Sequence, residues 1–170
     1  FYKLALGGIF AIIVIGGYMA FTGYANDVYP LDQSVGFLDR IVATSDPQSI
    51  IADINSIKAN LPETGNPVWI FPTDSTNFAR IQADLDTMLI SAEKITAVPT
   101  DSAAYHTGML DINSRSVLIQ ENIADAIPYM YVSFSNIIFS SIWIAAILGV
   151  FAVLNKKKQK MQEYDVSKDV

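Results

Sequence analysis

Cysteine is absent from this sequence of 170 residues, and histidine occurs once, at His106. The lack of cysteine excludes disulfide bonds, thiol catalysis and thiolate metal sites. A single imidazole excludes any site that needs two histidines from one chain. No Asn-x-Ser/Thr sequon occurs, so N-linked glycans are not expected. The sequence begins with Phe1 instead of methionine, and we expect a few residues of the gene product to precede it.

Catalytic sequence motifs are also lacking. The sequence contains no G-x-S-x-G, H-E-x-x-H or phosphate-binding-loop pattern. We therefore predict that the chain is not an enzyme by itself and that it holds no cofactor of its own.

Positive charge is scarce in the middle of the chain. Between Asp27 and Asp125 there are fourteen acidic and five basic residues, a net charge of −9. Phosphate binding needs clustered lysine and arginine, so this acidity excludes nucleic acid as a partner. The whole chain is 51% hydrophobic, and its apolar residues concentrate at the two ends.

The first apolar end is an uncharged segment of twenty-two residues from Leu4 to Ala25. At about 1.5 Å per residue, a helix of this length spans a hydrocarbon core about 30 Å thick. A signal peptide is the alternative, because Gly23-Tyr24-Ala25 resembles a small-x-small cleavage site. The run exceeds the roughly 7–15 apolar residues of a signal peptide, which favours a retained anchor. We assign residues 1–26 to a first transmembrane helix.

The second apolar end follows Asp125 and is most apolar over Ile137–Leu154. Lys156, Lys157, Lys158 and Lys160 come directly after it, and lysines in this position mark the cytoplasmic side. Binding of anionic lipid is a second interpretation of these lysines. We assign residues 128–155 to a second transmembrane helix.

This charge pattern predicts the topology. Residues 156–170 form a cytoplasmic tail, and Lys3 precedes the first span. Both termini are therefore expected in the cytoplasm, with residues 27–127 outside the plasma membrane.

Small residues recur at four-residue spacing in both spans, and they let helix backbones approach closely in lipid. The two spans either pack on each other or dock on other subunits. In the first span the small residues face several directions, which favours several neighbours. The candidate partner contacts are Gly7, Ala11, Gly16 and Ala20 in the first span and Ser141, Ala145 and Gly149 in the second.

Four stretches of the acidic segment have apolar residues at helical spacing. Asp46 and Pro47 cap the second stretch, the third begins at Asp74 or Ser75, and Thr100 or Asp101 caps the fourth. We expect the fourth to bend at Pro128 and run on into the second span. The residues expected inward are Leu31, Val35, Leu38, Val42, Ile50, Ile54, Ile57, Leu61, Phe78, Ile81, Leu85, Met88, Ala92, Ile95, Tyr105, Met109, Ile112, Ile119 and Ile123.

The fold class follows from these elements. We predict an all-α protein in which two transmembrane helices flank an extracytoplasmic antiparallel bundle of about four helices.

One long segment cannot be helical, because Pro62–Thr73 contains three prolines and a glycine. It carries four consecutive apolar residues, Val68, Trp69, Ile70 and Phe71, which a solvated loop does not normally expose. The segment either folds down as a lid on its own bundle or inserts into a neighbouring subunit, with Trp69 as the anchor.

His106 and Met109 form an H-x-x-M pair, which one helical turn would bring together. Imidazole and thioether ligands suit copper, but two ligands do not make a closed site. A metal role would need groups from another chain, and an ordinary, partly buried histidine is the expected alternative.

The segment GNPVWIFPTDSTNF, from Gly65 to Phe78, lies between two anchors in an acidic helical domain followed by a lysine-rich tail. This combination resembles the accessory membrane subunits of the archaeal ammonia monooxygenase complex. The resemblance implies a trimeric, copper-dependent membrane monooxygenase whose active site lies in other subunits. It assigns no ligand residue to this chain.

The sequence therefore predicts a non-catalytic structural or accessory subunit of a larger membrane complex, with other membrane subunits and the lipid bilayer as partners. The alternative is an extracytoplasmic sensor or ligand-binding module, because two-span receptors often carry a four-helix bundle outside. Only fifteen residues follow Asn155, too few for an output domain, so a sensor would need a separate signalling partner.

Overall fold

A computed structural model describes the backbone of residues 2–166 and the side chains of residues 7–160. Lys3 and residues 161–170, on which part of the predicted topology depends, lie outside the described side chains. The elements are α1 (Tyr2–Gly23), the π-helix η1 (Tyr24–Val28), α2 (Tyr29–Ala43), α3 (Pro47–Asn60), α4 (Phe78–Thr96), α5 (Ala103–Tyr131) and α6 (Phe134–Val166).

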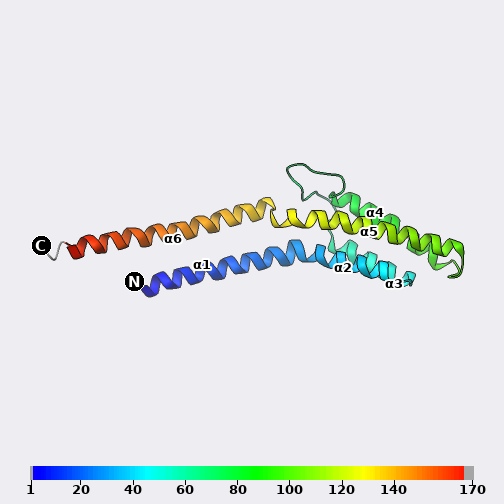
Figure 1. The fold of residues 1–170 in the computed structure, drawn as a ribbon, viewed down its shortest axis with the longest axis horizontal. Coiled ribbons are helices and arrows are strands. Elements are labelled where there is room, and N and C mark those ends of the chain that lie inside the picture. Colours follow the sequence, from blue (N-terminus) through cyan, green and yellow to red (C-terminus); the bar gives the residue numbers. More distant parts are fainter. Residues whose placement is uncertain (1, 167–170) are drawn as a thin grey trace. The chain divides into compact units, whose positions relative to one another are not determined.

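The described backbone contains no β-strand, so the all-α class is confirmed for it. The chain divides into two compact units. Unit 1 contains α1 and α6, and unit 2 is formed by residues 24–133 (Figure 1).

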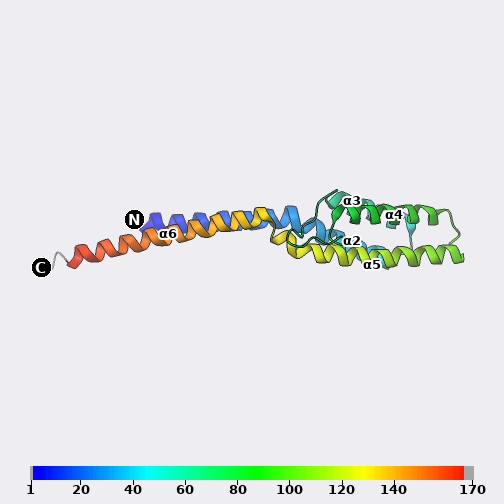
Figure 2. The same cartoon turned by 90° about the horizontal axis from the view of Figure 1, so that it is seen from above.

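The four helices of unit 2 pack around one apolar core. α2 contacts α3 and α5, and α4 contacts the same two helices, so each has two neighbours (Figure 2). Leu38, Ile54, Leu85 and Ile119 are buried in this core, one from each helix. Apolar side chains removed from water in this way stabilise the unit by about 1.5–3 kcal/mol each.

The inward residues expected from the sequence are buried or partly buried, with one exception. Val42 is 41% exposed, and the adjacent Ile41 is fully buried instead. Ser34 is also fully buried, and its hydroxyl donates to the Pro30 carbonyl at 2.8 Å. The inward stripe of α2 thus consists of Leu31, Ser34, Leu38 and Ile41, and apolar spacing alone misses it because one of its members is a serine.

The helix caps explain where α3, α4 and α5 begin. Asp46 caps α3 as expected, and its carboxylate accepts from the Ser49 backbone N–H at 3.0 Å. α4 was expected to start at Asp74 or Ser75 but starts after Asn77, whose side chain accepts from the Ala79 N–H. α5 is capped by Ser102, not by the two residues before it.

Two irregularities interrupt the helices. η1 comes directly before α2, where Pro30 has no N–H to donate to a carbonyl in the preceding turn. α5 continues for one turn beyond Pro128 and ends at Tyr131. The expected run-on into the second span is therefore wrong, because Val132 leaves helical dihedral angles, with φ −101° and ψ 29°.

Two helical segments, Gly7–Ala43 and Ala103–Lys160, each contain a stretch long and apolar enough to cross a membrane. Neither stretch is buried in the structure, in contrast to the core helix of a soluble protein. By length and composition, a signal sequence would also fit the first of them.

Candidate functional site

In unit 1, α1 and α6 meet along a seam that we define by Ile12, Gly16, Gly23, Asn136 and Trp143. The Trp143 indole N–H donates to the Ile12 carbonyl at 2.9 Å. A Cβ on Gly16 would lie 2.5 Å from the Trp143 ring, so the seam needs glycine there. A Cβ on Gly23 would lie 3.5 Å from the Asn136 amide oxygen. Since the later residue of α1 faces the earlier residue of α6, the two helices are antiparallel.

The other small residues predicted as contacts face away from this seam. A Cβ added to Gly7 or Gly149 would meet no atom of the described residues within 4 Å. Of the seven small residues, only Gly16 thus lies between α1 and α6, and the other six are on open faces. The six exposed residues are Gly7, Ala11, Ala20, Ser141, Ala145 and Gly149.

The segment between α3 and α4 is a loop whose base is closed by polar side chains. The Asn66 amide donates to the Thr73 carbonyl at 2.7 Å. Its oxygen accepts from the Val68 N–H at 2.9 Å and from the Thr76 hydroxyl at 3.0 Å. Gly65 has a φ of +110°, a conformation that side-chain-bearing residues rarely adopt. These contacts fix the two ends of the apolar segment against each other.

The apolar residues of the loop separate into two groups. Val68 is buried, with 7% of its surface exposed. Trp69, Ile70 and Phe71, which we call the loop tip, are 53%, 60% and 81% exposed. Val68 is therefore buried, whereas the loop tip keeps more than half of each side chain exposed. The loop itself projects from the start of α4 as an extended segment (Figure 1).

The loop tip is tied to the end of α5. The Trp69 indole N–H donates to the Val132 carbonyl at 3.2 Å. Val132 caps α5, and carbonyls at a helix C-terminus have no partner within the helix. The bond thus satisfies a helix end and sets the position of Trp69.

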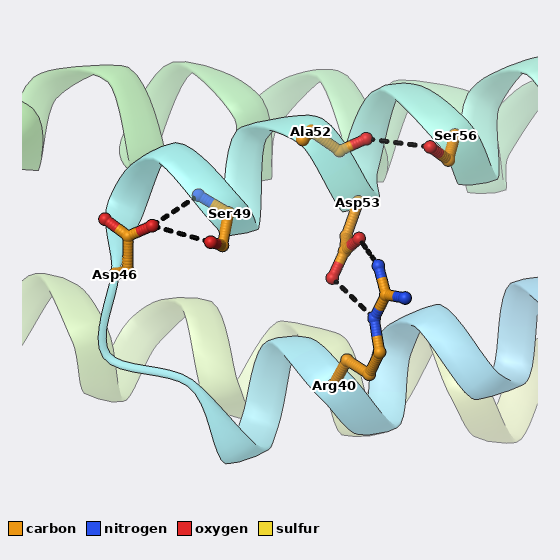
Figure 3. A network of polar contacts seen from close by, with 6 residues as sticks. All are labelled: Arg40, Asp46, Ser49, Ala52, Asp53 and Ser56. Atoms are coloured by element: carbon orange, nitrogen blue, oxygen red, sulfur yellow. Dashed lines mark hydrogen bonds and ion pairs between the residues drawn. The ribbon is translucent and has the colours of Figure 1, made fainter.

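An ion-pair network joins α2 to α3 on another face of unit 2 (Figure 3). The Arg40 guanidinium contacts both carboxylate oxygens of Asp53, and this hydrogen bonding raises the pKa of Arg40. The carboxylate of Asp46 lies nearby and accepts from the Ser49 hydroxyl and N–H, which lowers the pKa of Asp46. A shallow hollow is lined by Arg40, Thr44 and Asp53, but its charges neutralise each other. The network's evident role is to hold α3 against α2.

The structure does not bring His106 and Met109 together as ligands. Met109 is buried in the core of unit 2, whereas His106 is exposed and stands edge-on to Tyr105 at 6.0 Å between ring centroids. Among the described residues, no three His, Cys, Asp or Glu side chains group closely enough to hold a metal ion.

No family model matches this sequence, and the comparisons with curated proteins and with solved structures found no match either. The functional argument therefore depends on the surfaces described above.

Three important residues escaped the sequence analysis: Asn66, Val132 and Trp143. Asn66 had a local indication, because Asn-Pro favours turn initiation. No local pattern indicated Trp143 or Val132, because each forms its hydrogen bond with a residue more than sixty positions away.

Proposed function

We propose that this protein is a non-catalytic accessory subunit of a larger membrane complex. In this arrangement α1 and α6 span the plasma membrane, both termini are cytoplasmic, and unit 2 is an antiparallel bundle outside. The observation that carries the proposal is the set of open small residues on α1 and α6. In lipid, small residues allow close packing between helices, which stabilises their association. The contact between α1 and α6 covers only Gly16 of the seven small residues, so the other six remain open to further helices.

The resemblance to accessory subunits of archaeal ammonia monooxygenase suggests which complex this is. In such a complex the copper chemistry belongs to other subunits, and this chain contributes surfaces only. The exposure of His106 and the burial of Met109 are consistent with that division.

The test is recovery of neighbouring chains with the full-length protein from its native membrane in mild detergent. Gly7→Leu and Gly149→Leu introduce side chains at positions where an added Cβ meets no described atom within 4 Å. We expect either change to lower the recovery of partner chains about tenfold, the effect of about 1.4 kcal/mol of lost association free energy.

Gly36→Leu is the matched control, because Gly36 is an equally open helical glycine in α2 of unit 2. It should leave recovery unchanged. Purification of the wild type only as a free monomer would contradict the proposal. Partner recovery unaffected by the leucines would show that these faces do not hold the complex.

A further inference from the structure

The loop tip is largely exposed in this chain. Its position, its aromatic chemistry and the charge around it indicate which surface it contacts. We propose that Trp69, Ile70 and Phe71 insert into the outer headgroup layer of the membrane and fix that end of unit 2 to the lipid surface. This inference depends on the membrane-spanning arrangement proposed above.

The first argument is the position of the tip along the chain. Its indole bonds to Val132, only two residues before Phe134, where the apolar helix α6 begins. Two residues of extended chain reach about 7 Å. The hydrogen bond adds 3.2 Å to this reach. If α6 enters the bilayer, the indole nitrogen of Trp69 is therefore held within roughly 10 Å of the residue at which α6 begins.

The second argument is the chemistry of the tip. Trp prefers the membrane interface, where its ring contacts apolar groups and its N–H keeps a polar partner. Here Trp69 has that partner in the Val132 carbonyl, while about half of the side chain stays exposed. Ile70 and Phe71 add apolar surface beside it, without any polar group that needs water.

Other exposed aromatic residues of unit 2 occur at the same two chain junctions. Tyr24 and Tyr29 follow α1, with ring centroids 6.2 Å apart, and Tyr131 precedes α6. All three are exposed, at 41%, 45% and 54%. η1, which contains Tyr24, also contacts α5, so these rings and Trp69 belong to one end of unit 2.

The third argument is charge. Residues 64–73 carry none, whereas the segment from Asp27 to Asp125 has a net charge of −9. A tip without lysine or arginine does not rely on anionic lipid, and the acidic unit would be repelled by it. The surface that fits is therefore a zwitterionic one, such as phosphatidylcholine.

The absence of cysteine allows a direct test with single labels on the full-length chain. Phe71→Cys, carrying a nitroxide, would be studied in phosphatidylcholine nanodiscs and in native membranes. Collisions with dioxygen report contact with lipid, and collisions with a water-soluble nickel chelate report contact with water. We expect frequent dioxygen collisions and rare nickel collisions at this position.

Leu110→Cys is the matched control, because Leu110 is 67% exposed and lies in α5 near the opposite end. Its label should collide freely with the nickel chelate. Ile142→Cys, in α6, tests the membrane location itself. If Ile142 is also in water, the proposed membrane arrangement fails, whereas water at Phe71 alone overturns only the insertion of the loop.

Protein contact is distinguished by the same experiment. A Phe71 label shielded from both reagents in native membranes would show that a subunit covers the tip, which also overturns the proposal. Since a label replaces one inserting residue, unlabelled protein supplies a second measurement. Lipids brominated near the headgroup should quench wild-type fluorescence more than that of Trp69→Phe, because Trp143 is common to both. Equal quenching would contradict insertion.

Discussion

Asn66 is the side chain on which the shape of the loop depends. Its amide donates to the Thr73 carbonyl and accepts from the Val68 N–H and the Thr76 hydroxyl, so it connects the two sides of the loop base. Thr76 is itself 3% exposed, and its hydroxyl contacts Thr73 as well as the Asn66 oxygen, so the loop base is a connected network of hydrogen bonds. A single polar residue thus allows three apolar neighbours to project from the bundle.

Asp46 provides a prediction on the pH dependence of stability. Its hydrogen bonds from Ser49 lower its pKa in the folded state below the unfolded value of about 3.9. The cap therefore contributes in full above about pH 4, and its contribution is lost as the pH falls through the folded pKa. Asp46→Asn keeps a capping side chain but cannot titrate.

The measurement is the melting temperature of the full-length protein in detergent between neutral and acidic pH. Other carboxylates titrate in both proteins, so the difference between wild type and Asp46→Asn isolates the cap. We expect that the melting temperature of the wild type falls more steeply below pH 4. Parallel curves would contradict a titrating cap.

At the scale of the helix, the α1–α6 seam is set by one glycine and one tryptophan. Gly16→Val would place a Cβ 2.5 Å from the Trp143 ring, closer than such atoms can approach, and should separate the helices there. A cysteine pair at Gly23 and Asn136 would report this, because those residues already face each other across the seam. We expect efficient disulfide formation in the otherwise unchanged chain and a marked loss with Gly16→Val.

Gly17→Val is the control for that experiment. Gly17 is the next residue on α1, but a Cβ there meets nothing within 4 Å. Crosslinking should survive this change. If both valines act alike, helix propensity and not contact with Trp143 determines the pairing.

Sequence periodicity was enough to predict the helices, because their stripes repeat at positions such as Ile50, Ile54 and Ile57, all buried. It did not predict that Ser34 is buried, because a polar residue is expected at the surface. Only the structure shows that the Ser34 hydroxyl is satisfied by the Pro30 carbonyl. Nor did it predict the start of α4, because Asp74 and Ser75 are as good caps as Asn77. The candidate contact residues of the helices and the loop could be selected from their size and apolar character. Which of them are exposed could not be predicted, because this depends on contacts between residues far apart in the sequence.

At the scale of the whole molecule, the proposed topology can be tested with membrane-impermeant maleimide on intact cells. Leu110→Cys, on the exposed surface of α5, should react from outside. Lys158→Cys, in the lysine-rich segment after the second span, should react only after the membrane is permeabilised. Reaction of both in intact cells would contradict cytoplasmic termini.

The hydrogen bond between Trp69 and Val132 joins residues 63 positions apart. During synthesis at about 5–20 residues per second, Val132 follows Trp69 by roughly 3–13 s. Throughout that interval the indole has no Val132 carbonyl to bind, and the loop is attached only at its own base. The newly made chain therefore presents an unsecured aromatic segment, and its docking must come after α5 is complete.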